Sequence, residues 1–399
     1  MAPTTDNNAH TARSAKRAAS LDRRWFLRNA ALGSAGAALL LPALQQRAAA
    51  TIPDRWEDED PDCRQLEALL QDEADREALH AFFWPIYAAA DQLDLDGWMS
   101  QFPANPEPFI LSQNAPIGDV SFNGISVNGP DCGIEGTADI RSAFGALFKF
   151  VGATKGPGQL FKLSHASGNL NYGAAIDYVD LPKTFYVNGV DVLSYNVFHH
   201  GKIVRRIDYY DTAQLSAADL ARLHPGGTPR QSCVPDPTSL TASAASPEML
   251  AFTRAFHRAL RSGRHELVAQ FFTHDALLIH PLLNRESGPY GLFNQGIQIR
   301  GAHTIGRFFK AVLQTLPDGI HAVTTDVTGG RTGGGYEWVA KGIYAGQGIG
   351  RNGLLGMTSI SLFGNRISRM SVKFDTMQMT TEQRQTLRDA LERDFWSCS

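Results

Sequence analysis

Apolar positions along the chain follow one pattern twice, in the same order and at a nearly constant distance. The matching segments are 81–87 with 251–257, 98–102 with 267–271, 135–148 with 300–312, and 201–211 with 365–375. Self-similarity of this kind indicates that the chain contains two copies of one structural unit.

Each copy predicts helices followed by long strands. The early segments carry apolar residues at the three- and four-residue spacing of amphipathic helices, and Gly136 and Gly301 each precede a further helix. The later segments alternate as strands do, and each copy closes on a strand that ends in an aspartate, Asp211 or Asp375. Helices followed by a run of antiparallel strands predict an α+β fold.

The domain boundaries follow from these segments. We expect a first module at 70–215 and a second module at 245–385, joined by a linker at 216–244. The linker is rich in Pro, Ser, Thr and Ala, a composition that cannot bury a core. An N-terminal extension at 51–69 and a C-terminal tail at 386–399 complete the predicted organisation.

The first fifty residues form a separate segment. Residues 23–28, Arg-Arg-Trp-Phe-Leu-Arg, resemble the twin-arginine consensus, and 29–44 form a weakly apolar stretch. Ala48-Ala49-Ala50 supplies the small residues that a signal peptidase requires. The sequence therefore predicts a twin-arginine signal peptide over 1–50 and a periplasmic or secreted protein. The alternative is a short amphipathic helix after a disordered tail.

Length and charge narrow the class of partners. The 399 residues suit about two domains, and the net charge of −3 with no long basic run argues against nucleic acid. No stretch after the leader is apolar enough to span a membrane. The cysteines lie far apart without a CxxC pair, so no metal or cofactor is predicted, and the disulfide pairing stays open; they are Cys63, Cys132, Cys233 and Cys398.

The order of elements and the segment 201–211 resemble the SnoaL-like branch of the nuclear-transport-factor-2-like superfamily. In that family three helices pack on a strongly curved, mainly antiparallel sheet, and the cone between them is a pocket. The resemblance implies two cone-shaped α+β barrel modules in tandem. Paired modules of this kind cover their open sheet faces, so we expect them to pack as an intramolecular pseudo-dimer.

Segment 87–98 resembles the first-helix motif of scytalone-dehydratase-like members of that family. The resemblance implies that Asp94 orients a catalytic histidine, and His165 opens a strand where those enzymes carry one. An Asp–His pair in an apolar pocket can transfer protons near neutral pH. In the alternative interpretation, Asp94 caps the turn between two helices and His165 is a satisfied strand residue.

The last strand of the first module places Arg206, Asp208 and Tyr210 on one face. Cyclases and limonene-epoxide-hydrolase-like enzymes of the family use an aspartate on this strand, and Asp208 is the best match. Asp211 recurs as Asp375 in the second copy, so we interpret it as structural.

Aromatic and amide side chains complete the predicted site. Tyr87 lies two helical turns before Asp94, where its phenol can stabilise an oxyanion; the alternative is a core position. The predicted substrate-binding residues are Tyr210, Arg206, Tyr195, Asn196 and Trp98.

The second module has a different polar set and lacks counterparts of Asp94, His165 and Asp208. We expect a degenerate or differently specialised pocket that also packs against the first module. Its candidate residues are His257, His280, His321 and Glu337, whose spacing does not indicate a metal site.

The sequence as a whole predicts an exported, cofactor-independent acid–base enzyme. It would be a lyase, isomerase, cyclase or epoxide hydrolase acting on an apolar, oxygenated small molecule in the pocket of the first module. The alternatives are a periplasmic binding protein for a lipophilic molecule and a structural or partner-binding module.

Overall fold

The structure is a computed structural model, and the part of the chain it describes begins at residue 63. The described residues are 63–105, 108–112, 121–122, 125–126, 134–154, 156–158, 161–180, 190–216, 244–284, 297–316, 320, 322–340 and 354–398. The chain divides into two compact units, residues 1–66 and 67–399, and the sheets all belong to the second unit. The predicted signal peptide, nearly all of the linker, His321 and the four cysteine side chains lie outside the described part.

The first half of the second unit contains three helices and a six-stranded sheet of order β4-β1-β8-β7-β6-β5. Neighbouring strands are antiparallel except for the parallel pair β1 and β8. The helices are α3 (Cys63–Asp91), α4 (Leu95–Met99) and α5 (Thr137–Thr154), and the 3₁₀ turn is η2 (Thr212–Gln214). The strands are β1 (Phe109–Ser112), β4 (Ile134–Glu135), β5 (Phe161–Asn169), β6 (Gly173–Asp180), β7 (Val190–His199) and β8 (Lys202–Tyr209), with a separate hairpin of β2 (Ser121–Phe122) and β3 (Ile125–Ser126).

The second half repeats this order of elements. Its sheet has the order β11-β10-β15-β14-β13-β12-β9, which matches the first sheet once the short β9 is set aside. The helices are α7 (Pro247–Arg261), α8 (His265–Ala269), α9 (Ala302–Gln314) and α10 (Thr381–Asp394), with 3₁₀ turns η3 (Pro281–Leu283), η6 (Thr376–Gln378) and η7 (Trp396–Cys398). The strands are β9 (Ala244–Ala245), β10 (Phe272–Ile279), β11 (Gln298–Arg300), β12 (Ala322–Gly330), β13 (Gly333–Ala340), β14 (Leu354–Phe363) and β15 (Arg366–Phe374). The prediction of an α+β fold with mainly antiparallel sheets is confirmed.

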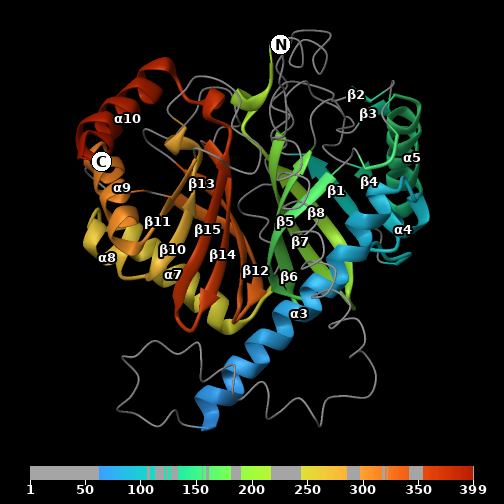
Figure 1. Cartoon of the computed structure of the whole chain (residues 1–399), viewed down its shortest axis with the longest axis horizontal. Coiled ribbons are helices and arrows are strands. Elements are labelled where there is room, and N and C mark those ends of the chain that lie inside the picture. The colour runs from blue at the N-terminus through green and yellow to red at the C-terminus, as the bar shows by residue number, and fades with distance from the viewer. Residues whose placement is uncertain are drawn as a thin grey trace, which may run out of the picture. The chain divides into compact units, whose positions relative to one another are not determined.

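Two element boundaries differ from the sequence prediction. Helix α3 begins at Cys63, inside the segment predicted as an extension. Residues 386–394, predicted as part of a tail, form most of α10, which starts with a capping box at Thr380 and lies beside α9 (Figure 1). Leu387, Leu391 and Phe395 share one helix face and are buried in the core of the second half. This apolar stripe holds the C-terminal helix on the fold.

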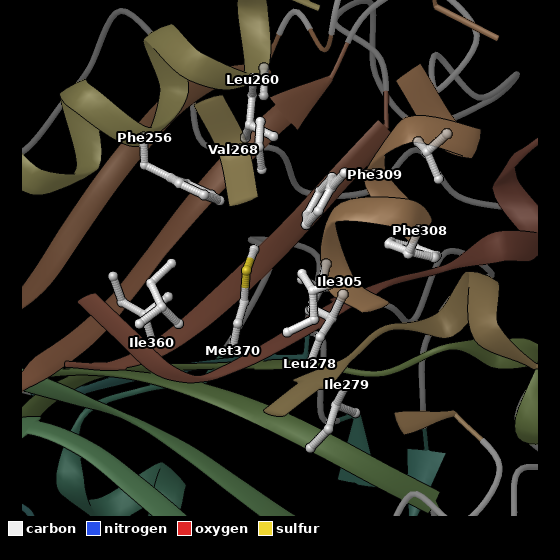
Figure 2. Packing of buried hydrophobic residues seen from close by; sticks show 14 of the residues in the cluster. Phe256, Leu260, Val268, Leu278, Ile279, Ile305, Phe308, Phe309, Ile360 and Met370 are labelled. Atoms are coloured by element: carbon white, nitrogen blue, oxygen red, sulfur yellow. The ribbon is translucent and has the colours of Figure 1, made fainter. Parts of the chain in front are cut away.

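A hydrophobic core fills the space between helices and sheet in each half. In the second half, side chains from α7, α8 and α9 meet those of β10, β14 and β15 over the sheet (Figure 2). A third cluster joins the outer faces of the two sheets, and its members are Ala175, Leu193, Tyr195, Ile207, Tyr209, Val339, Leu355 and Met357. The two sheets therefore bury apolar surface against each other.

Ion pairs cross this contact between the sheets in a reciprocal pattern. Arg205 of β8 lies 3.2 Å from Glu337 of β13, and Arg369 of β15 lies 3.3 Å from Asp177 of β6. Arg369 occupies in β15 the position that Arg205 occupies in β8, and Glu337 matches Asp177 in the same way. Each half therefore contributes an equivalent arginine to an equivalent carboxylate of the other.

A second reciprocal contact lies immediately after β8 in the first half and immediately after β15 in the second half. The carboxylate of Asp211 accepts hydrogen bonds from the amide and hydroxyl of Thr376, at 3.1 and 2.9 Å. Asp375 accepts the equivalent bonds from Thr212, at 3.2 and 2.6 Å. Both aspartates are fully buried and also cap the 3₁₀ turns that come after them. These contacts agree with the structural interpretation of Asp211.

Gly173 marks a place where the two sheets approach too closely for a side chain. It has a φ of +155°, and a Cβ there would lie 1.9 Å from Thr328 Oγ1 of β12 and 2.3 Å from the Asn196 carbonyl oxygen. We expect Gly173→Ala to lower the free energy of unfolding by about 3 kcal/mol, measured by urea denaturation. Gly201→Ala is the control: its φ is +68° with nothing within 4 Å, so it should lose only about 1 kcal/mol. Equal losses would contradict the steric argument.

Candidate functional site

Asp94 and His165, predicted as a proton-transfer pair, lie in different environments. Asp94 is exposed, and its Oδ1 accepts the Gly97 amide at 3.0 Å as the N-cap of α4. His165 comes after a bulge in β5, and its Nε2 lies 2.7 Å from Ser361 of β14 and 3.1 Å from Ser167. His165 thus faces the second sheet, and its burial there lowers its pKa to about 4. The structure gives the two members of the predicted pair different partners: Asp94 caps a helix, and His165 contacts the other sheet.

Tyr195 also lies between the two sheets, outside the space between helices and sheet of its own half, for which we use the word cone. Its ring belongs to the cluster that joins them, and the guanidinium of Arg205 lies 5.7 Å from the ring centroid. Burial, with the carboxylates of Asp326 and Glu337 nearby, raises the pKa of the Tyr195 phenol well above its usual value. Alternation along β7 thus turns Tyr195, predicted as a substrate-binding residue, away from the cone.

Four of the predicted residues do meet in the cone of the first half. The Arg206 Nε donates to Asp208 Oδ1 at 3.1 Å, and its Nη2 lies 3.5 Å from the Tyr87 hydroxyl. The guanidinium also lies 5.4 Å from the centroid of the Trp98 ring, which packs edge-to-face with Tyr87. Tyr178, which the sequence did not indicate, faces the same guanidinium at 5.2 Å.

The two other predicted residues share this face of the first sheet. Asn196 is fully buried and pairs across the strands with Arg206. Tyr210 is buried in the core of the first half. The face predicted from the alternation of Arg206, Asp208 and Tyr210 is thus the one that looks into the cone.

A cavity lies over the second sheet, in the cone of the second half. The volume of this cavity is about 60 Å³. Its lining is His257, Leu260, His280, Phe308, Phe309, Val312, Ile320, Ala322, Tyr336, Trp338, Ala340, Thr358, Met370, Val372 and Phe374. Most of these side chains are apolar, so the few polar groups among them decide how a ligand is oriented.

His280 is held in one tautomer. Its Nδ1 accepts the backbone amide of Leu282 at 3.2 Å, and a backbone amide can only donate. Burial, with Lys373 nearby, lowers the pKa of His280 to about 3, so the ring is neutral at ordinary pH. A neutral ring with an acceptor at Nδ1 carries its proton on Nε2. His280 therefore offers an N–H donor.

His257 and a hydroxyl pair form the rest of the polar lining. His257 Nδ1 lies 2.9 Å from Thr324 Oγ1, and burial lowers its pKa to about 4. Its ring packs edge-to-face on Tyr336 at 4.8 Å. Thr358 Oγ1 accepts from the Trp338 indole at 3.0 Å and also bonds the Tyr336 phenol.

The sequence placed the pocket in the first module, whereas this cavity lies in the second. Sequence reasoning named His257 and His280 without a joint role and missed Tyr336, Trp338 and Thr358. A signal existed for the first two of these, because Tyr336 and Trp338 alternate along β13 and so share a face. No sequence pattern indicated which sheet would enclose a cavity.

Within the described ranges, two further features are absent. No group of three or more His, Cys, Asp or Glu side chains there could hold a metal ion. No helix among these residues is long and apolar enough to cross a membrane.

No protein-family model matches the chain, and no curated protein matches it. Similar solved structures include SnoaL-like and nuclear-transport-factor-2-like proteins. A SnoaL-like protein of unknown function from Burkholderia thailandensis is 13% identical, with a TM-score of 0.26 over 32% of this chain and 94% of its own. A steroid delta-isomerase from Pseudomonas aeruginosa is 15% identical, with a TM-score of 0.26 over 39% and 98%. A putative polyketide cyclase from Sinorhizobium meliloti is 14% identical, with a TM-score of 0.23 over 31% and 94%.

Proposed function

We propose that this protein binds an apolar, oxygen-bearing small molecule in the cavity of its second half and catalyses proton transfer on it. The observation that carries the proposal is the presence of two neutral imidazoles, His257 and His280, in the lining of one largely apolar cavity. Burial lowers both pKa values far below neutrality, to about 4 and about 3. At neutral pH both rings can therefore act as neutral bases or donors.

The two histidines suit different parts of one reaction. The Nε2–H of His280 donates to a ligand carbonyl oxygen and stabilises the negative charge that develops on it. In the tautomer whose Nδ1–H donates to Thr324, His257 presents an unprotonated Nε2 that removes a proton from the neighbouring carbon. The C–H electron pair moves into an enolate, and return of the proton at another carbon gives an isomer. The class of reaction is an isomerase or lyase reaction next to a carbonyl.

Binding without catalysis is the second candidate function. The low pKa of His257 makes its imidazole a weak base. This observation favours a binding protein for a lipophilic molecule, with His280 as the donor that orients it.

Removing the His280 donor tests the proposed reaction. In His280→Asn the amide oxygen can still accept the Leu282 amide, but the Nε2–H is lost. We expect deuterium exchange at the α-carbon of cyclohexenone in D₂O, followed by NMR, to fall by about 100-fold relative to wild type. His257→Asn, which keeps a partner for Thr324, should reduce exchange by a similar factor.

The outcomes separate the two functions. Wild-type exchange no faster than in buffer rules out proton transfer on this ketone. Retention of the ketone in native mass spectrometry would then favour the binding function. Exchange that is unchanged in both variants would show that the site lies elsewhere.

The arrangement of the two halves is also part of the proposal. We infer that the chain is a tandem duplication whose modules pack as an intramolecular pseudo-dimer. The equal strand orders and the reciprocal contacts of Arg205 with Glu337 and Arg369 with Asp177 support this. Export through the twin-arginine route remains a proposal that rests on residues 23–50.

A further inference from the structure

Three polar side chains in the histidine cavity of the second half form a chain of hydrogen bonds. They are Trp338 and Tyr336 of β13 and Thr358 of β14, each at most 8% exposed. The indole Nε1 of Trp338 donates to Thr358 Oγ1 at 3.0 Å, and the Thr358 hydroxyl also bonds the Tyr336 phenol. Within the described part of the chain, no further partner of either hydroxyl is found.

This chain of groups has one hydrogen more than it has acceptors. The indole N–H and the two hydroxyls carry one hydrogen each, and two of these three hydrogens are used between the groups. An indole can only donate, so the surplus hydrogen lies on a hydroxyl whichever way the bond between Thr358 and Tyr336 runs. Both residues line the cavity. A buried donor without an acceptor is costly, so this hydrogen calls for an acceptor on the ligand.

The surplus hydrogen belongs to Tyr336. When Trp338 donates to Thr358 and Thr358 donates to Tyr336, each hydroxyl accepts one bond and donates one, and bonds in such a chain strengthen one another. The hydrogen bond from Thr358 acts to lower the pKa of Tyr336, as a bond donated to the phenol oxygen does, while burial raises that pKa overall. The phenol therefore keeps its proton at ordinary pH and presents it to the cavity.

The position of Trp338 is set by a glycine on the facing strand. Gly356 lies directly opposite Trp338 and two residues before Thr358, so Gly356 and Thr358 share a face of β14. A Cβ at position 356 would overlap the Trp338 indole. The bare backbone therefore lets the ring lie against β14 and bring its N–H to Thr358.

The first sheet shows that the fold does not require this chain of hydrogen bonds. At the register of Tyr336 and Gly356 it has Ile176 and Val192, which are both buried. Apolar residues at these two positions leave the first sheet without the phenol and without the gap for an indole. Since the fold forms without the chain, the surplus donor of the second half indicates a contact with a ligand.

His280 supplies a donor in another part of the cavity. It follows β10, and β15 and β14 lie between β10 and the strand of Tyr336. Neighbouring strands are about 4.8 Å apart, so the two backbones are roughly 14 Å apart. The ring contacts agree: His280 packs against Phe308 and Phe374, whereas Tyr336 packs against His257. The two donors therefore face different ends of a ligand.

The lining limits the kind of oxygen that can accept from Tyr336. A carbonyl oxygen accepts without bringing a hydrogen of its own, whereas a hydroxyl brings one that needs a further acceptor. A carboxylate would bury a charge, and there is no lysine or arginine among the residues that line the cavity. A second carbonyl oxygen meets the need of the phenol without either cost.

We propose that the ligand of this cavity carries two carbonyl oxygens, one at each end of a small ring. His280 donates to one oxygen through its Nε2–H, and Tyr336 donates to the other through its phenol. Thr358 is a positioning residue, because it holds the phenol oxygen and leaves the phenol hydrogen for the ligand. This inference rests on the binding function proposed above and adds the second oxygen to it.

The test compares two ketones of the same ring, cyclohexane-1,4-dione and cyclohexanone, titrated into the full-length protein by calorimetry. Two equivalent carbonyl groups give the dione a statistical advantage of about twofold. Beyond that factor we expect it to bind at least about tenfold more tightly, because cyclohexanone leaves the phenol hydrogen buried without an acceptor. Carbon NMR of the bound dione should show both carbonyl carbons shifted downfield, as each accepts a hydrogen bond.

Variants of the two hydroxyl residues identify the second donor. Tyr336→Phe should abolish the preference for the dione. Thr358→Val should lower the preference by about threefold, Thr358→Ser should retain it, and Thr358→Val should have no further effect in the Tyr336→Phe protein. Thr332→Val is the matched control: this buried threonine bonds the Gly168 carbonyl oxygen outside the cavity, so the wild-type preference should remain.

The outcomes distinguish this inference from the function on which it rests. His280→Asn should weaken binding of both ketones by a similar factor and keep the preference for the dione. Binding of cyclohexanone with no preference for the dione would overturn the second oxygen and leave the binding function intact. Binding of neither ketone would overturn both. A preference that survives in Tyr336→Phe would overturn the assignment of the second donor to Tyr336.

Discussion

Replacing Lys373 with methionine should lower the free energy of unfolding by about 3–5 kcal/mol, because it strands a buried carboxylate. Lys373 of β15 is completely buried and lies 3.1 Å from Asp191 of β7, itself about 5% exposed. Burial raises the pKa of Asp191, and the ammonium of Lys373 opposes that rise. Without Lys373 the carboxylate must stay charged in an apolar setting or take up a proton.

Urea denaturation monitored by tryptophan fluorescence measures this loss. Arg141→Ala is the control, since Arg141 pairs with Asp96 on the surface, with side chains 46% and 83% exposed. We expect that change to cost less than about 1 kcal/mol. Adding Asp191→Asn to Lys373→Met should recover part of the loss, because the unpaired charge is then gone. A loss as small as that of the control would show that the pair does not hold the sheets together.

The stability difference between wild type and Asp375→Asn should depend on pH. Burial, together with the like charge of Asp211, raises the pKa of Asp375 from 3.8 to about 7. The folded state then binds a proton that the unfolded state releases, so wild-type stability from this group falls as pH rises from about 4 to about 7. Above pH 7 this contribution to wild-type stability no longer changes with pH. The amide of Asp375→Asn stays neutral throughout. Between about pH 4 and pH 7 the free energy of unfolding of the variant should therefore rise by up to about 4 kcal/mol relative to that of wild type.

The measurement is urea unfolding of both proteins at intervals from pH 4.5 to 8. The comparison isolates Asp375, since His257 and His280 titrate in both proteins and cancel in the difference. Asp211→Asn should reduce the pH dependence as well, because it removes the like charge that contributes to the rise in the pKa of Asp375. Wild-type and variant profiles that run parallel would mean that Asp375 is ionised in the folded protein throughout.

The sequence predicted those features of the fold that a local pattern of residues determines. The helical spacing of apolar residues and the alternation along the last strand indicated the α+β elements and the face of Arg206, Asp208 and Tyr210. The same local rules failed at the C-terminus. There the stripe of Leu387, Leu391 and Phe395 forms a docked helix where a tail was expected.

The candidate site was harder to predict, because a residue type does not reveal which face of a strand is covered. His165 has the chemistry of a catalytic base, but the bulge in β5 turns it toward Ser361 of the other sheet. Asp94 has a carboxylate that could orient a base, but the adjoining helix α4 uses it as a cap. The role of His165 depends on a residue that is distant in the chain, and the role of Asp94 depends on the local backbone geometry.

The sequence by itself determined the two matching series of elements, their α+β class and the set of side chains able to move protons. Apolar periodicity carries that information because each element must bury one face wherever it packs. Only the tertiary structure decided which sheet faces meet each other and which look into a cone. That choice placed His257 and His280 around one cavity, and it brought Arg205, Lys373 and Asp375 into contact with polar groups of the other half. The packing of two whole sheets fixes such contacts, and no short segment specifies them alone.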